Sequence, residues 1–314
     1  MNTKDTSKTE RNEVALNFLD VTSQSGDDFR EILSLSRQPL TPILKDLGVA
    51  LIFEKPSLRT RNSSEMAVKD LGGHPVYIQD NEVGFDKRES AEDIARVLST
   101  YYKVIAARVF SHQVLVRMSN ALLMSGANTP IVNLLSDVSH PCQAVADLLT
   151  ISDYFPDFAR VSITYVGDSN NVARSLAQAC ALVGSRVRIA SPVDFSFDEA
   201  TKGELGLLGD IEFYDDPLKA VAGANVVYTD TWTSMGEEDQ ASIRREVFSR
   251  EFTVDSKMMA SASEGAIFMH CLPAHRGEEV TNEVIESSAS VVFEQAANRR
   301  DAFRGVLRKL CATT

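Results

Sequence analysis

Short β-rich runs alternate with helical patterns along the chain of 314 residues, and this alternation constrains the fold more than any other feature. In the first half, the predicted strands cover residues 49–53, 75–78, 104–107 and 130–133. In the second half, they cover residues 160–166, 186–189, 225–228, 266–269 and 290–293. Strands that alternate with helices usually pair in parallel. The sequence therefore predicts an α/β fold of two domains, each with a central, mostly parallel sheet flanked by helices.

Helical patterns fill the segments between the predicted strands. In residues 91–102, for example, Ile94, Val97 and Leu98 share one face of a helix. A helix at residues 140–154 is expected to join the two halves. Another, at residues 295–309, follows the final predicted strand.

The charge balance is acidic, because 44 Asp and Glu residues outnumber 32 Lys and Arg residues and leave a net charge of −12. Nucleic acids and anionic membranes bind to basic surfaces, so we expect neither as a partner. An anionic small substrate would need a local cluster of Arg and His side chains that offsets this charge. Arg and His residues that occur close together after predicted strands are therefore candidate functional residues.

Four cysteines are scattered along the chain without a CxxC pair or a Cys/His cluster: Cys142, Cys180, Cys271 and Cys311. This pattern favours reduced thiols in a cytoplasmic protein, and it argues against a disulfide framework or a bound metal. The polar first residues, MNTKDTSKTERNE, do not have the pattern of a secretory signal. No apolar run approaches the roughly 20 residues of a membrane helix. We expect a cytoplasmic protein with no metal.

Two segments in the first half follow predicted strands and carry polar side chains. In FEKPSLRTR, residues 53–61, a helix start with Ser57, Arg59 and Thr60 suits a phosphate group, because helix N-termini present unpaired N–H groups. The alternative is a capped helix with two surface arginines. In SDVSHPCQ, residues 136–143, His140 and Gln143 lie where open α/β sheets bind ligands. A histidine that only caps or packs at a helix start is the alternative there.

Three segments in the second half also follow predicted strands. The turn GDSNN, residues 167–171, resembles a nucleotide-binding turn but keeps only its first glycine. Its Asn170 and Asn171 could cap a helix or hydrogen-bond a carboxylate. In DTWTSMG, residues 230–236, Asp230 could hold an ammonium group or could simply form a turn. In HCLPAHRG, residues 270–277, Cys271 suggests a nucleophile. A buried cysteine is usually inert, and no triad is indicated, so we do not favour that role.

Taken in order, these segments resemble the aspartate/ornithine carbamoyltransferase family. The family pattern FxKxSTRTR resembles residues 53–61, HPxQ resembles residues 140–143, and HCLPAHRG-E is present at residues 270–278. DTWTSMG together with HCLP is similar to the family members that use ornithine, whereas those that use aspartate carry HPLPR instead of HCLPA. The resemblance covers nearly the whole chain from about Asn17 onward.

The resemblance implies transfer of the carbamoyl group of carbamoyl phosphate to the side-chain amine of L-ornithine, in arginine metabolism and without a cofactor. It implies a carbamoyl phosphate-binding domain at residues 1–145 and an ornithine-binding domain at residues 146–294. A C-terminal helix, residues 295–314, is expected to return to the first domain. A homotrimer with sites at the subunit interfaces is implied as well.

Site residues follow by position in the motifs. The residues that the resemblance assigns to carbamoyl phosphate are Ser57, Leu58, Arg59, Thr60, Glu82, Arg108, His140, Gln143 and Arg299. Those assigned to ornithine are Asn171, Asp230, Ser234, Met235, Cys271 and Leu272. The expected catalytic residues are Arg59, Arg108, His140 and Cys271. Asp230 is expected to hold the α-ammonium group, and Cys271 to position the amine and its proton rather than to attack.

Three positions depart from the family pattern. Leu58 replaces a threonine, Glu82 replaces a glutamine that reaches a neighbouring subunit's site, and Arg300-Asp301 replaces Leu-His. A carboxylate at position 82 would repel an anionic substrate unless a cation such as Lys87 or Arg88 pairs with it. Three alternatives stay open: a nicotinamide-dependent dehydrogenase, a binding protein without activity, and an acceptor such as putrescine or an acylated ornithine.

Overall fold

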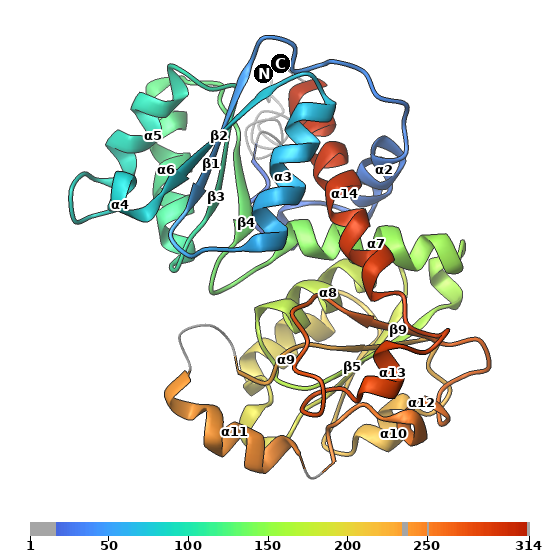
Figure 1. The fold of residues 1–314 in the computed structure, drawn as a ribbon. Coiled ribbons are helices and arrows are strands. Elements are labelled where there is room, and N and C mark those ends of the chain that lie inside the picture. Colours follow the sequence, from blue (N-terminus) through green and yellow to red (C-terminus); the bar gives the residue numbers. More distant parts are fainter. Residues whose placement is uncertain (1–16, 234–237, 250, 313–314) are drawn as a thin grey trace, which may run out of the picture. The chain divides into compact units, whose positions relative to one another are not determined.

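The computed structural model describes residues 17–233, 238–249 and 251–312. The chain divides into two compact units (Figure 1), of which unit 1 combines residues up to Val145 with those from Arg299, and unit 2 comprises Ala146–Asn298. Each boundary falls inside a continuous helix. These helices are α7 (Pro141–Tyr154) and α14 (Val292–Ala312).

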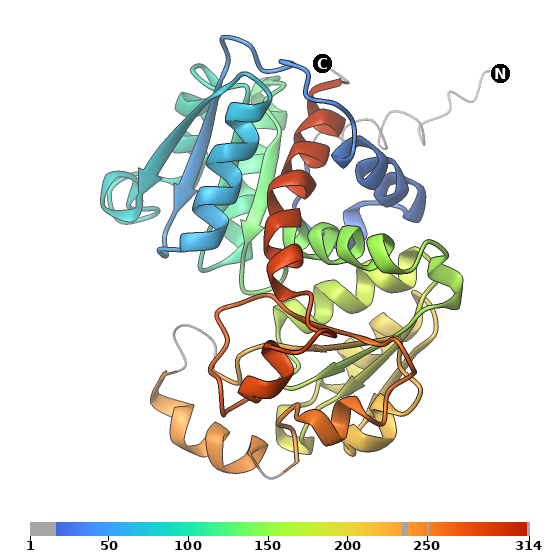
Figure 2. The same cartoon turned by 45° about the vertical axis from the view of Figure 1, so that its right-hand side comes forward.

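Unit 1 is built on a parallel sheet of four strands in the order β2-β1-β3-β4. Its strands are β1 (Gly48–Phe53), β2 (His74–Gln79), β3 (Val104–Arg108) and β4 (Ile131–Leu135). Its helices, besides parts of α7 and α14, are α2 (Gly26–Ser36), α3 (Leu58–Asp70), α4 (Asp80–Val83), α5 (Ala91–Ser99) and α6 (His112–Ser125). Figures 1 and 2 show α3 on one face of the sheet and α5 with α6 on the other. Both faces of the central strands are therefore covered, which is why β1 and β3 are almost entirely apolar and buried.

Unit 2 is built on a parallel sheet of five strands in the order β7-β6-β5-β8-β9. Its strands are β5 (Ser162–Val166), β6 (Arg186–Ala190), β7 (Ile211–Tyr214), β8 (Val226–Thr229) and β9 (Ile267–His270). Its helices, besides parts of α7 and α14, are α8 (Asn171–Leu182), α9 (Glu199–Gly206), α10 (Pro217–Val221), α11 (Ala241–Phe248), α12 (Ser256–Met259) and α13 (Asn282–Ile285). One apolar core joins the sheet to helices α10 to α13.

The predicted fold class, two parallel-sheet α/β domains with a C-terminal helix, is confirmed. Two details of the strand prediction are wrong. Residues 290–293 form no strand, because Ser290 makes only an isolated bridge to Phe268 before α14 begins at Val292. The strand β7 was not predicted, and its half-exposed position at the sheet edge leaves it without a continuous apolar run.

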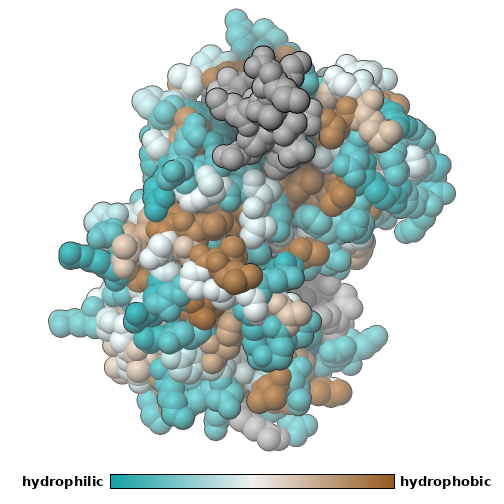
Figure 3. All heavy atoms as spheres, turned by 180° about the vertical axis from the view of Figure 1, so that it is seen from behind, coloured by the Kyte–Doolittle hydropathy of each residue, from teal (hydrophilic) through white to brown (hydrophobic). Residues whose placement is uncertain are grey.

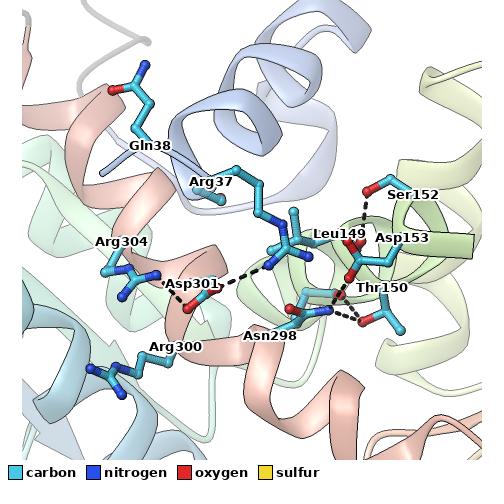
Figure 4. A network of polar contacts seen from close by, with 12 residues as sticks. Arg37, Gln38, Leu149, Thr150, Ser152, Asp153, Asn298, Arg300, Asp301 and Arg304 are labelled. Atoms are coloured by element: carbon cyan, nitrogen blue, oxygen red, sulfur yellow. Dashed lines mark hydrogen bonds and ion pairs between the residues drawn. The ribbon is translucent and has the colours of Figure 1, made fainter. Parts of the chain in front are cut away.

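Ion pairs fix the part of α14 that belongs to unit 1. Arg300 and Arg304 both donate to Asp70 at the end of α3. Figure 4 shows that Asp301 accepts from Arg304 and from Arg37. Burial alone would raise the pKa of Asp70, but the hydrogen bonds from the two arginines outweigh it and hold that pKa below its usual range. The departure Arg300-Asp301 therefore serves the packing of α14 in unit 1.

Apolar side chains on the surface form small clusters among hydrophilic ones, as the face drawn in Figure 3 shows. Among the most exposed are Tyr101 at the end of α5 and Met124 in α6, which are 70% and 84% exposed. Across the described residues, we find no helix that is both long enough and apolar enough to span a membrane.

Candidate active site

The strands of unit 1 end side by side at the carboxyl edge of the sheet. Phe53 at the end of β1 pairs with Gln79 of β2 and with Arg108 of β3, and Arg108 pairs with Leu135 of β4. The segments that follow these strands therefore start at one edge, which is where open α/β sheets bind ligands. They carry most of the predicted carbamoyl phosphate residues.

Helix α3 begins directly after the first of these segments. Ser57 adopts an extended backbone conformation and caps the helix, because its hydroxyl accepts a hydrogen bond from the backbone N–H of Thr60 at 3.3 Å. The Leu58 side chain is 75% exposed, so this residue offers the site only its backbone N–H. Arg59 follows on the same first turn and is half-buried. The helix N-terminus thus presents backbone donors and a positive dipole end.

Arg299 joins two of the predicted residues that are far apart in sequence. Its Nη2 donates to the Thr60 hydroxyl at 2.8 Å, and its Nη1 donates to the Gln143 side-chain oxygen. All three side chains are buried, with Thr60 2%, Gln143 1% and Arg299 7% exposed. A planar guanidinium held at two points keeps its remaining N–H groups in a fixed orientation.

His140 lies in the same buried environment, directly before α7. The pKa of His140 lies well below its ordinary value, first because the ring is buried and then because Arg299 and Arg108 add positive charge nearby. Arg108 itself is only 5% exposed at the end of β3. His140 is therefore neutral near neutral pH, and a neutral imidazole can donate one N–H to a substrate oxygen without adding charge.

The turn that precedes His140 is fixed by a residue that the sequence did not reveal. The buried Asn133 amide donates to the Leu19 carbonyl, the Ser136 hydroxyl and the Ser139 carbonyl at 2.8–3.1 Å. A buried amide with three acceptors holds the backbone in one conformation. An asparagine inside the apolar run PIVNLL was the only available signal.

Glu82 follows the edge strand β2 and is exposed. Its carboxylate caps its own helix, because it accepts the backbone N–H of Gln79 at 2.8 Å. Arg88, one of the two cations considered as its partner, donates to the backbone carbonyls of Asn81 and Glu82. The described contacts therefore give Glu82 a structural role in α4.

The strands of unit 2 also end together. Val166 of β5 pairs with Thr229 of β8, which pairs with His270 of β9. Directly after β8, Asp230 is only 7% exposed, and its two carboxylate oxygens accept from different neighbours. The Cys271 thiol donates to Oδ1 at 3.0 Å, and the Asn170 amide donates to Oδ2 at 3.2 Å. These two donors, an amide and a thiol, orient the carboxylate of Asp230.

The turn after β5 contributes Asn170 rather than only the predicted Asn171. The Asn170 side chain also accepts from the backbone N–H groups of Val172 and Ala173, so it caps α8 while it contacts Asp230. Asn171 is the first residue of α8 and is half-buried. An asparagine at a helix start can cap the helix or hydrogen-bond a carboxylate, and Asn170 does both; the sequence did not show that the carboxylate is that of Asp230.

The segment after β9 is ordered by a buried acid, Glu279, that was not among the predicted site residues. The Leu272 backbone N–H donates to His270 Nδ1 at 2.8 Å, so the ring proton must lie on Nε2. That nitrogen lies 3.1 Å from the carboxylate of Glu279, and both side chains are fully buried. Leu272 adopts a positive φ of 58° in this turn. His270 and Glu279 thus fix the turn that carries Cys271.

Two predicted ornithine residues, Ser234 and Met235, lie outside the described residues. Within the described part of the chain, two groups of side chains have potential metal-ligating atoms within 4.8 Å of one another. The first group contains Asp230, His270 and Cys271, and both nitrogens of His270 are engaged as described above. The second contains His275, Glu278 and Glu279, where Glu278 pairs with Arg245 at 2.7 Å.

Comparisons with known proteins agree with these observations. Residues 11–153 match the family model for the "Aspartate/ornithine carbamoyltransferase, carbamoyl-P binding domain", and residues 159–310 match the model for the "Asp/Orn binding domain" of the same family. The chain is 46% identical over 279 residues to the ornithine carbamoyltransferase of Hyperthermus butylicus, with 87% of each chain covered. It is 40% identical over 293 residues to that of Archaeoglobus fulgidus, with 90% of this chain and 94% of the relative covered.

Solved structures give the same result. The ornithine carbamoyltransferase from Pyrococcus furiosus matches with a TM-score of 0.85 at 40% identity, and covers 93% of this chain and 96% of its own. The anabolic enzyme from Campylobacter jejuni matches with a TM-score of 0.88 at 30% identity. The resemblance indicated by the sequence motifs is confirmed: the chain belongs to the aspartate/ornithine carbamoyltransferase family.

Proposed function

We propose that this chain transfers the carbamoyl group of carbamoyl phosphate to the side-chain amine of L-ornithine, which gives L-citrulline and phosphate. The observation that carries the proposal is the buried cluster of unit 1, where Arg299 links Thr60 to Gln143 beside Arg108 and a neutral His140. In a protein of net charge −12, such a concentration of buried cations is costly unless it serves an anionic ligand.

Carbamoyl phosphate has two parts, and the cluster offers donors that suit each. The phosphate carries full negative charge, which the N-terminus of α3, Ser57 and the guanidinium groups of Arg59 and Arg299 would bind. The carbamoyl oxygen gains negative charge as the amine attacks. Fixed donors at that oxygen stabilise the tetrahedral intermediate, and we assign this to Arg108 and His140.

Asp230 is the proposed anchor of ornithine in unit 2. Its buried carboxylate would pair with the α-ammonium group. The pKa of Tyr165 lies well above its ordinary value, first because the ring is buried and then because Asp230 and other acidic groups lie nearby. The side-chain amine must be neutral to attack, although an amine of this kind has a pKa near ~10.4 in water. The site must therefore bind the neutral form or remove a proton.

Cys271 is proposed to position that amine and its proton. Its thiol donates to Asp230, so it is oriented by the same carboxylate that would bind ornithine. Direct attack by the amine on the carbamoyl carbon needs no covalent enzyme intermediate, because phosphate is already an adequate leaving group. The reaction as proposed uses neither a metal nor an organic cofactor.

The test is citrulline formation from carbamoyl phosphate with four acceptors compared: L-ornithine, putrescine, N-acetylornithine and L-aspartate. We expect turnover with ornithine alone. Turnover with another acceptor would keep the assignments in unit 1 and overturn the role of Asp230. No product with any of the four would contradict the proposed function.

A homotrimer is proposed as the assembled state, in which Glu82 contributes to carbamoyl phosphate binding in a neighbouring subunit. The family resemblance supports this, as does the exposure of large apolar side chains such as Tyr101 and Met124 in the single chain. The capping role of Glu82 leaves its second carboxylate oxygen available for such a contact. Light scattering on the purified protein would measure the mass of the assembly. A cytoplasmic location stays a prediction from the scattered cysteines.

A further inference from the structure

An ion pair in unit 2 lies beside the residues proposed to bind ornithine, but neither of its two residues is among them. Arg244 of α11 donates to the carboxylate of Asp168 at 2.8 Å, and both side chains are about nine-tenths buried. We infer that this pair is a positioning device for ornithine, because it sets the turn after β8, which carries Asp230, against the turn after β5, which carries Asn170. The inference rests on the proposed function and names two residues that the reaction itself does not require.

The geometry links the two turns through one guanidinium group. Arg244 Nη1 contacts Asp168 in the turn after β5, and the same nitrogen donates to the backbone carbonyl of Trp232 at 2.9 Å in the turn after β8. Two residues further along the first turn, Asn170 contacts Asp230, which lies two residues before Trp232. The bridge from Asp168 to Trp232 therefore runs beside the bridge from Asn170 to Asp230.

Two aromatic rings support this arrangement, one against the guanidinium and one on the helix that carries it. The carbon at its centre lies 4.9 Å from the ring of Phe195, whose backbone carbonyl accepts the N–H of Ser169 in the same turn after β5. Four residues after Arg244, Phe248 stacks on Trp232 with ring centroids 5.6 Å apart. Helix α11 thus contacts the turn after β8 through two side chains, the guanidinium of Arg244 and the ring of Phe248.

The energetics argue for a function beyond stability. A buried ion pair rarely stabilises a fold more than apolar side chains of equal size would, because both charges lose their water. Its hydrogen bonds do impose one geometry on the groups that they join. The turn Gly167-Asp168, whose pattern resembled a nucleotide-binding turn, thereby has a different explanation: its carboxylate anchors Arg244.

The test compares steady-state constants for both substrates in Arg244→Met, Arg244→Lys and the double variant Asp168→Asn with Arg244→Met. We expect the KM for ornithine to rise about ten-fold in Arg244→Met, a change of about 1.4 kcal/mol. The KM for carbamoyl phosphate should stay within about two-fold, and Arg244→Lys should recover part of the loss. Should the unpaired Asp168 prevent Arg244→Met from folding, the double variant, which buries no charge, provides the same measurement.

Arg188→Met is the matched control, because Arg188 also donates to backbone carbonyls of unit 2, those of Ala220 and Ala222, but none of the described contacts joins it to Asp230. It should leave both KM values unchanged. Trp232 is the only tryptophan of the chain, so its fluorescence emission should shift in Arg244→Met and not in Arg188→Met, whether or not the protein makes citrulline. An unshifted emission, or an unchanged KM for ornithine in an active variant, would overturn the inference. If the unmodified protein forms no citrulline, that result would instead contradict the proposed function.

Discussion

The buried His140 should make the stability of the protein depend on pH in a specific direction. Its folded-state pKa is lowered by burial and by Arg299 and Arg108, so the unfolded chain binds a proton at this position before the folded chain does. The free energy of unfolding is therefore highest above the unfolded pKa of about 6.5, and it decreases as the pH falls below that value because protonation favours the unfolded chain. If the folded ring stays neutral throughout, lowering the pH from about 7 to about 5 costs about 2 kcal/mol of unfolding free energy.

The assay is urea denaturation followed by far-UV circular dichroism, which detects the helices and strands of both units, whereas the only tryptophan, Trp232, lies in unit 2. The variant His140→Asn keeps a polar side chain but cannot titrate in this range. Other groups titrate equally in both proteins, so the difference between the two free energies of unfolding isolates the contribution of His140. We expect that difference to change by about 2 kcal/mol between the two ends of the pH range. Parallel stability profiles for the two proteins would refute a neutral, buried histidine.

Three further predictions concern the proposed substrate contacts. Arg299→Lys should raise the KM for carbamoyl phosphate at least about ten-fold, since a lysine cannot hold Thr60 and Gln143 at once; an unchanged KM would exclude this role. Asp230→Asn should raise the KM for ornithine by about ten- to one hundred-fold, the value of a charge-assisted hydrogen bond, and leave that for carbamoyl phosphate unchanged; equal effects on both would point to general misfolding. Cys271→Ser should retain substantial turnover, whereas mass spectrometry that detected a carbamoyl group on Cys271 would overturn its positioning role.

The alternation of elements was predictable because parallel strands covered on both faces appear as continuous apolar runs, such as GVALIF in β1. The prediction from apolar runs was wrong for two segments that are not strands buried on both faces. The strand β7, IEFY, lies at a sheet edge and is half-exposed, so its pattern is mixed. Val291 and Val292 are buried where α14 begins rather than in a strand, and Phe293 in its first turn is exposed. A short apolar run alone does not distinguish these two structures.

The candidate site was predictable only in part. That Thr60 and His140 follow strands was visible in the sequence, and parallel strands place such residues at one edge. The contacts of Arg299 with Gln143 and Thr60 span 156 and 239 residues, and no spacing rule predicts them. The supporting roles of Asn133 and Glu279 depend on which backbone groups surround a buried polar side chain, and a single sequence does not contain that information.

The most direct test of the central claim is to measure citrulline and phosphate together, in the presence of carbamoyl phosphate and L-ornithine. The proposed reaction predicts one citrulline for each phosphate released, and no phosphate beyond spontaneous breakdown when ornithine is omitted. Phosphate released by the protein without citrulline would show that the protein breaks down carbamoyl phosphate without transferring the carbamoyl group to ornithine. That result would contradict the role given to Asp230 and, with it, the proposed function.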